Sequence, residues 1–204
     1  PEIALGLGYE QDDIFRRVEA FMGDYYTKAQ TIHQLCGILE ERLVHASSGN
    51  TSRISFKNVL NAYRSPPLRK VDEFDLQEGL LSSSDMEIFE NDPERIIRLF
   101  RHAQKFKAKL SPDLRALVRN RLSLIDSTLI NSSSANVTFR SILQEVGNVS
   151  PILYEMHELG VLGRFVPEFG RLSCKVQHDL YHRFTADVHV LHCLRKLDEV
   201  FQNK

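Results

Sequence analysis

The chain has 204 residues, and its 26 lysines and arginines nearly balance its 27 aspartates and glutamates, giving a formal net charge of −1. This balance excludes the basic excess of a protein that grips nucleic acid or an anionic membrane through bulk charge. A hydrophobic content of 42% is typical of a folded globular protein and excludes a disordered chain.

The apolar runs, the cysteines and the two ends of the sequence suggest where the protein works and whether the chain is part of a longer protein. No run of about eighteen apolar residues occurs, so the sequence predicts no membrane-spanning helix. Cys36, Cys174 and Cys193 lie far apart without a CxxC pair, which predicts a reducing, cytoplasmic setting. The chain begins at Pro1 and ends in a helix-like stretch, so we expect a piece of a longer protein.

The first predicted element is a helix of about thirty residues over 14–43, because apolar residues recur there at steps of three and four. They are Ile14, Val18, Phe21, Tyr25, Ala29, Ile32, Leu35 or Cys36, Leu39 and Leu43. Met22, Tyr26 and Ile38 make this stripe broader than a two-strand seam. We therefore expect it to be buried against several parts of the same chain rather than to form a coiled-coil dimer, which is the alternative. Turn-forming residues over 47–52 are expected to end the helix.

One passage predicts β-structure. Residues 74–80 alternate apolar and polar side chains and run into a glycine, Gly79. This pattern predicts a small β-hairpin near 74–82.

Three later helices are predicted from prolines that follow capping residues. Asp92, Ser111 and Ser150 each precede a proline and a run of apolar residues with helical spacing. Their side chains are expected to cap the helices that begin there, because an oxygen at this position can accept from a free backbone N–H. Gly160 is expected to close the third of these helices.

A fourth helix is predicted over 136–146, closed by Gly147, with its inward residues being Phe139, Ile142, Leu143 and Val146. The polar, serine-rich residues 126–135 before it are expected to connect two helical groups. The predicted fold is therefore mainly α, bundle-like, with one domain over 1–135 and a second helical segment over 136–204.

Common enzyme motifs are absent from the sequence. It contains no GxxxxGK[ST] phosphate loop, no GxGxxG after a strand, no GxSxG elbow, no HExxH and no cysteine-rich zinc spacing. We therefore expect no complete catalytic or cofactor-binding site within this chain.

Histidine is the exception, because five of the eight histidines lie between positions 157 and 192: His157, His178, His182, His189 and His192. Three interpretations remain open. His178, His182, His189 and Cys193 form HxxxH and HxxxC pairs that could close a zinc site. Alternatively, one or two histidines contribute to a larger metal site, or all of them cap and pack helices. The His178-Asp179 doublet lacks the partners of an HD signature and is interpreted as something else.

Two stretches in this region resemble a known family. Residues 156–169 (MHELGVLGRFVPEF) contain a GVLGxxxPEF pattern, and residues 177–189 (QHDLYHRFTADVH) follow QxDxYHxYTVDxH with Phe184 and Ala186 as the departures. Both are similar to the bifunctional PII uridylyltransferase/uridylyl-removing enzymes, at the entry to their HD domain. The resemblance covers about residues 10–204 and is specific from about 154 to 197.

The resemblance implies a helical middle domain followed by the first helices of an HD domain. It implies that His189 is one ligand of a divalent metal, Mg or Mn, with His182 or Asp187 as the candidate to orient it. It also implies a parent enzyme that transfers UMP from UTP to PII and hydrolyses it off again in nitrogen-status signalling. The remaining metal ligands, the UTP site and the glutamine-sensing domains have no match here, so we expect the fragment alone to be inactive.

The expected partners are the remaining domains of the parent chain, with PII as a further candidate and neither nucleic acid nor membrane. Two other functions stay open. One is a helical interaction scaffold of another nucleotidyltransferase-linked signalling protein. The other is a small zinc-binding helical domain.

Overall fold

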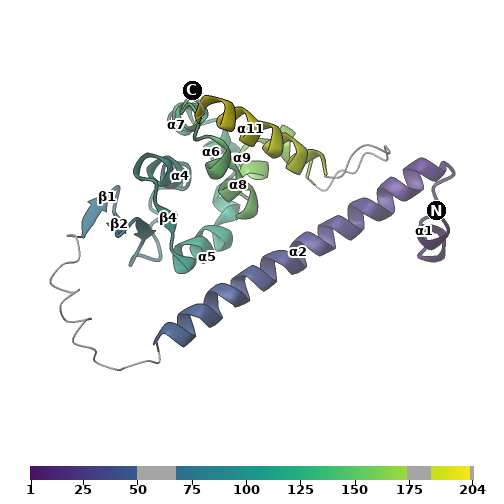
Figure 1. Ribbon diagram of the computed structural model, residues 1–204, viewed down its shortest axis with the longest axis horizontal. Coiled ribbons are helices and arrows are strands. Elements are labelled where there is room, and N and C mark those ends of the chain that lie inside the picture. The colour runs from purple at the N-terminus through teal and green to yellow at the C-terminus, as the bar shows by residue number, and fades with distance from the viewer. Residues whose placement is uncertain (50–67, 174–184, 203–204) are drawn as a thin grey trace.

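A computed structural model describes residues 1–49, 68–173 and 185–202. The chain is mainly helical and carries one small sheet (Figure 1). The fold class predicted from the sequence is therefore confirmed.

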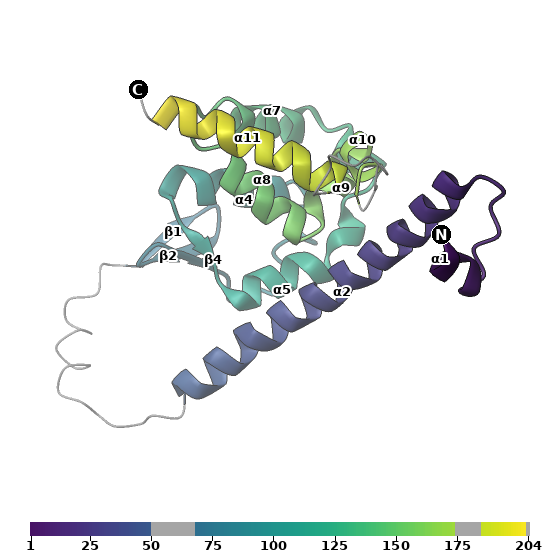
Figure 2. The ribbon, with the colours of Figure 1, turned by 45° about the vertical axis from the view of Figure 1, so that its right-hand side comes forward.

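The N-terminal part consists of α1 (Glu2–Gly6) and the long helix α2 (Ile14–Gly49). The predicted long helix is confirmed, and it continues beyond residue 43 through Gly49; the rest of its predicted end lies outside the described residues. Its main contacts are with α1 and with α5 (Pro112–Asn120), which runs alongside it in Figure 2.

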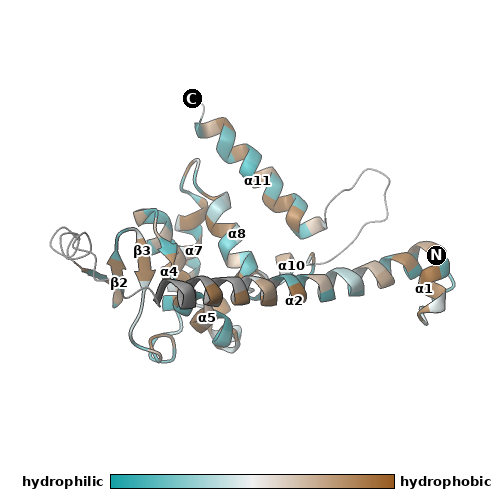
Figure 3. Ribbon diagram, turned by 60° about the horizontal axis from the view of Figure 1, so that its bottom comes forward, coloured by the Kyte–Doolittle hydropathy of each residue, from teal (hydrophilic) through white to brown (hydrophobic). Residues whose placement is uncertain are grey.

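Apolar positions recur along α2, where Figure 3 colours them brown, and many of them are exposed to solvent. Six residues of the stripe are each more than half exposed: Ile14, Tyr25, Ile32, Leu35, Leu39 and Leu43. The expectation that several parts of the chain bury this stripe is wrong for these residues. The reason is that α1 and α5 are short and cover only part of a helix that is 36 residues long.

The sheet has four strands in the order β1 (Arg69–Val71), β2 (Phe74–Gln77), β3 (Leu80–Ser82) and β4 (Lys109–Leu110). The strands β1, β2 and β3 are antiparallel, and β4 joins β3 in parallel. The predicted hairpin is β2–β3, and its turn places Glu78 and Gly79 at φ values of 52° and 76°, as two-residue hairpin turns require. The two outer strands have too few residues to show an alternating pattern in the sequence.

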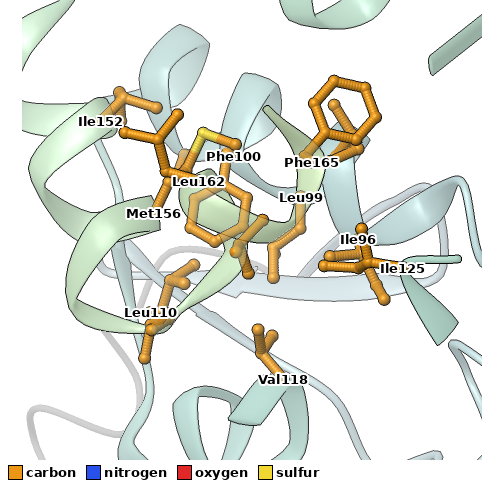
Figure 4. Close-up of a cluster of buried hydrophobic side chains, with 14 of the residues drawn as sticks. Ile96, Leu99, Phe100, Leu110, Val118, Ile125, Ile152, Met156, Leu162 and Phe165 are labelled. Carbon is orange, nitrogen blue, oxygen red and sulfur yellow. The ribbon is translucent and has the colours of Figure 1, made fainter. Parts of the chain in front are cut away.

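The remaining helices pack against this sheet and against one another. They are α4 (Arg95–Phe106), α5, the 3₁₀ turn η1 (Leu122–Leu124), α6 (Ser127–Ile130), α7 (Ser133–Leu143), α8 (Ser150–Glu158), α9 (Val161–Phe165), α10 (Pro167–Gly170) and α11 (Ala186–Gln202). A single cluster of buried apolar side chains extends from the sheet through α4 and α8 to Leu191 of α11. Ten of its members are labelled in Figure 4. The predicted division at 135/136 falls inside α7, which packs against α4, and the division into two domains stays a prediction.

The three predicted proline-linked caps have different outcomes. Ser111 caps α5 as predicted, because its hydroxyl accepts from Leu114 N at 3.2 Å. Asp92 does not cap α4, which begins at Arg95; its carboxylate binds Arg98 instead. Ser150 lies inside α8 rather than at its cap, and its N–H is satisfied by a distant side chain described below.

Residues 126–135 are a folded element rather than a plain connection. Asp126 caps α6 by accepting from Thr128 N and Leu129 N, and Ser132 caps α7 by accepting from Ala135 N. The serine-rich composition therefore reflects helix capping. In the following helix, Ile142 is buried as predicted, whereas Leu143 and Val146 are 45% and 71% exposed, because α7 ends at Leu143 and its contact face is narrower than expected.

Gly163 of the GVLGxxxPEF pattern and Gly170, which directly follows this pattern, let α9 and α10 approach closely. A Cβ on Gly170 would lie 2.3 Å from the carbonyl oxygen of Gly163. No side chain fits in that space, so the short path from α9 to α10 requires glycine at position 170.

Two polar groups connect the elements of this core. The first is Asp72, in the β1–β2 turn at φ 50°, whose carboxylate binds Arg98 Nε at 2.7 Å and Arg95 Nε at 3.3 Å. His102 Nε2 lies 3.4 Å from the same carboxylate. Burial alone would raise the pKa of Asp72, but the hydrogen bond from Arg98 and the charges of Arg98 and Arg95 outweigh it, so the pKa is lowered. Asp72 therefore links the β1–β2 turn of the sheet to α4 through Arg95 and Arg98.

The second polar group is Gln104 on α4, which is 2% exposed. Its Nε2 donates to Ile142 O at 3.1 Å and to Asn148 O at 2.7 Å, and its Oε1 accepts from Arg101 at 2.7 Å. Both N–H groups of this amide are thus used to join α4 to the end of α7 and the segment that follows it.

The C-terminus of α4 offers a test of local backbone strain. Lys107 ends this helix at φ 50° and ψ 38°, and its side chain is exposed. Because glycine adopts this left-handed conformation without a Cβ penalty, Lys107→Gly should raise the free energy of unfolding by about 0.5–1 kcal/mol. Urea denaturation measures the change, with Lys105→Gly, inside the helix, as the matched control that should lower stability by about 1 kcal/mol. A loss of stability in Lys107→Gly would contradict the assignment.

Candidate functional site

The predicted site residues that the structure describes lie on α11, which has two different faces. Asp187, Leu191 and Asp198 are buried toward α8, whereas His189 and Cys193 are exposed. The residues on the buried face recur at steps of four and seven, so they form one stripe along the helix. This spacing is the sequence signal that could have identified Asp198, which the sequence analysis missed.

The beginning of α11 is held by a buried polar contact with α8. Asp187 Oδ2 lies 3.5 Å from His157 Nε2, and the two side chains are 2% and 11% exposed. Asp187 Oδ1 accepts from Val188 N at 2.9 Å, within the first turn of α11. The His157 ring also packs edge-on against Phe169, with 5.6 Å between the ring centroids. His157 and Asp187 thus meet although they are 30 positions apart.

Toward its other end, α11 is held by the Asp198 carboxylate, which binds backbone N–H groups at the beginning of α8. Asp198 Oδ2 accepts from Ser150 N at 2.6 Å and from Val149 N at 3.0 Å. A carboxylate is stabilising at a helix N-terminus because it satisfies free N–H groups and faces the positive end of the helix dipole. Asp198 thereby supplies the cap that Ser150 was predicted to give.

The remaining histidines of the predicted cluster are not gathered at one point among the described residues. His189 Nε2 lies 3.8 Å from Cys193 Sγ, one helical turn further along α11. His192 lies beside Tyr154, with 6.2 Å between the ring centroids. His178, Asp179 and His182 lie outside the described residues, so the roles predicted for them stay predictions.

An exposed imidazole is a suitable donor for a divalent transition metal, but a bound metal needs three or four donors. Within residues 1–49, 68–173 and 185–202, no group of three or more histidine, cysteine, aspartate or glutamate side chains is placed to hold one. The described residues therefore place His189 beside Cys193 but do not form a complete metal site. The ligand role of His189 and the zinc-site alternative both stay predictions.

Within the part of the chain that the structure describes, no helix combines the length and the apolar character needed to cross a membrane.

Comparison with known proteins gives a consistent result. A family model described as the uridylyltransferase GlnD third domain matches residues 74–165. Similar relatives named bifunctional uridylyltransferase/uridylyl-removing enzyme come from Rhodopseudomonas palustris (33% identical), Bradyrhizobium sp. strain BTAi1 (32%) and Bradyrhizobium diazoefficiens (31%). Each alignment covers 98% of this chain and 22% of the relative. The chain therefore spans about a fifth of the length of the curated relatives it matches.

Proposed function

This chain corresponds to a partial region of the bifunctional uridylyltransferase/uridylyl-removing enzyme family, and we propose that it is the central, non-catalytic part of such an enzyme. The observation that carries the proposal is 33% identity over 203 residues, which is 98% of the chain. The mainly helical fold and the exposed position of His189 on α11 support it. In this proposal the full enzyme transfers UMP from UTP to PII and hydrolyses the UMP off again.

The role we propose for the chain is to hold α11 against a helical support and to contribute His189 to the uridylyl-removing site. Three or four ligands are needed to fix a metal, and the described residues do not gather three histidine, cysteine or carboxylate side chains at one point, so the other ligands would come from elsewhere in the enzyme. The divalent metal, Mg or Mn, would lower the pKa of a bound water and offset charge on the phosphoryl oxygens. UTP and the other ligands would be bound by the rest of the enzyme.

The experiment compares the purified 204-residue chain with the full-length protein, using uridylylated PII as the substrate and UMP release as the measurement. The chain alone should release no detectable UMP, whereas the full-length protein should release it. His189→Ala in the full-length protein should reduce release at least about 100-fold, as expected for loss of a group needed for hydrolysis, while UMP transfer to PII continues.

His33→Ala is the matched control, because His33 is also an exposed histidine on a helix, far from α11 in sequence. It should leave both reactions unchanged. UMP release by the isolated chain, or full release by His189→Ala, would refute the proposal.

A second candidate function is protein interaction, and the exposed apolar stripe of α2 favours it. Large apolar side chains gathered on one helix face are typical of a surface that another protein part covers. The occupant we propose is another domain of the same full-length enzyme, because most of the relatives' length lies outside this chain. Hydrogen exchange over residues 14–43 should be slower in the full-length protein than in the chain; equal exchange would refute this occupant, and slowing only on adding PII would identify PII instead.

A further inference from the structure

His157 has a second feature besides its burial: it reaches the first turn of the helix that carries His189. The contact from His157 Nε2 to Asp187 Oδ2 is 3.5 Å, and Asp187 is only two residues before His189. Because Asp187 also accepts the Val188 N–H at 2.9 Å, its carboxylate links α8 to the backbone of this first turn.

The position of α11 is fixed at both ends and along its buried face. Asp198 binds N–H groups at the beginning of α8, and Leu191, which lies between Asp187 and Asp198 on the same face of α11, is fully buried. Asp187 and Leu191 each lie two residues from His189, and Asp187 is the one that makes a polar contact with α8 in the first turn. Residues two apart on a helix point to nearly opposite sides, so a rotation of the first turn that releases Asp187 from α8 also moves His189.

The ring of His157 is itself held in place. Its side chain is 11% exposed, and it packs edge-on against Phe169 of α10. The residue therefore offers two separable properties: an aromatic ring that fills space beside Phe169, and a ring nitrogen that faces Asp187. Phenylalanine retains the first property, and glutamine, whose amide nitrogen extends about as far as Nε2, retains the second.

We propose that His157 is a positioning residue for the uridylyl-removing site: through Asp187 it fixes the first turn of α11 and hence the direction of His189. This inference rests on the proposed role of His189. It assigns a task in the hydrolysis to a residue of the helical support, which lies 32 positions away from His189 in the sequence.

The first test uses the 204-residue chain and measures amide hydrogen exchange over residues 186–193. His157→Phe should speed this exchange at least about fivefold, whereas His157→Gln should restore the original rate. His192→Phe makes the same chemical change elsewhere on the contact between α8 and α11, beside Tyr154, and should leave the exchange over 186–189 unchanged. Unchanged exchange in His157→Phe, or equal acceleration in His157→Phe and His157→Gln, would overturn the proposal.

If His157→Phe does not fold, Asp187→Asn provides the test instead, because it keeps the shape of the side chain and removes its charge. It should speed exchange over residues 186–189 while the melting of the core stays cooperative. An unchanged exchange rate in this variant would also overturn the proposal.

The second test uses the full-length protein and measures UMP release and UMP transfer separately. His157→Phe should lower kcat for release about tenfold, as is typical when a group supporting a ligand is lost, and His157→Gln should recover most of it. Transfer of UMP to PII should be unchanged in both. A general loss of structure would instead reduce both reactions and would not be rescued by glutamine.

His189→Ala distinguishes failure of this inference from failure of the proposed function. If His189→Ala retains release, the role of His189 is wrong and His157 has no site to position. If His189→Ala loses release while His157→Phe retains it, His189 acts in the hydrolysis and the inference about His157 alone is wrong.

Discussion

Gln104→Glu should lower the free energy of unfolding by about 3 kcal/mol at pH 7, as expected when buried polar groups lose a donor and gain a facing charge. The substitution replaces the Nε2 donor by a carboxylate oxygen, which would then face the carbonyl oxygens of Ile142 and Asn148. Because this residue is 2% exposed, water cannot take over the lost hydrogen bonds. Arg101 offsets part of the cost, since it already binds the other oxygen.

Urea denaturation at pH 7 and pH 5 measures this loss. It should be smaller at pH 5, because a protonated carboxyl recovers one donor. The matched control is Gln77→Glu, the same change on an exposed strand residue, which should alter stability by less than about 0.5 kcal/mol. A loss of similar size in both variants would show that the buried amide of Gln104 does not join α4 to the end of α7.

Asp72→Asn should lower the free energy of unfolding by about 2 kcal/mol at pH 7, because several charge-assisted hydrogen bonds in a partly buried network are lost together. Asparagine keeps the shape and tolerates the left-handed backbone at this position, so the loss reports the charge alone. The Arg98 side chain would keep Asp92, and Arg95 would keep its contacts with Glu73 and Asp92. His102 would lose its contact with the Asp72 carboxylate. Denaturant unfolding of the chain provides the measurement.

Glu73→Gln is the control for this variant, because Glu73 is the next residue in the same turn and its side chain is 66% exposed. It also contacts Arg95, at 3.4 Å, but an exposed pair contributes less than about 1 kcal/mol. An equal loss of stability in Glu73→Gln and Asp72→Asn would contradict the assignment of Asp72 as the link between sheet and α4.

The same network should make stability depend on pH in a direction that its pKa shifts determine. The pKa of Asp72 is lowered in the folded chain, so its contribution is present above the unfolded pKa of about 4 and is lost as pH falls through the folded value. Burial lowers the pKa of His102, despite the opposing contact with Asp72, so stability also falls as pH drops below the unfolded histidine pKa of about 6.5. Asp72→Asn should remove the part of the loss near pH 4 and below.

Local signals in the sequence were reliable where an element is stabilised by its own residues. The helical period over 14–43, the turn at Glu78-Gly79 and the Ser111 cap each depend on groups within a few positions, and the structure confirms all three. The cap at Ser150 was mispredicted for the opposite reason. The N–H groups of that helix end are satisfied by Asp198, 48 positions later, and no local pattern records such a partner.

In the candidate site, too, some features follow from the local sequence and others depend on how distant helices pack. The sequence drew attention to the histidines, and the helical spacing of Asp187, Leu191 and Asp198 could have shown which face of α11 is buried. The pairing of His157 with Asp187 could not be predicted, because it depends on how α8 and α11 pack. The predicted burial of the α2 stripe is wrong for a related reason. A sequence pattern shows that a helix has an apolar face but not whether this chain contains enough partners to cover it.

By itself, the sequence determined the mainly helical class, the existence and approximate limits of the long helix and the hairpin, and the resemblance to a family of enzymes. These follow from short-range preferences and from residue identity. Only the tertiary structure decided which polar groups satisfy each other: Asp72 with Arg98, Gln104 with two distant carbonyl groups, and Asp198 with the beginning of α8. The physical reason is that burying a polar group requires a partner, and the chain path, rather than the local sequence, determines which partner lies within reach.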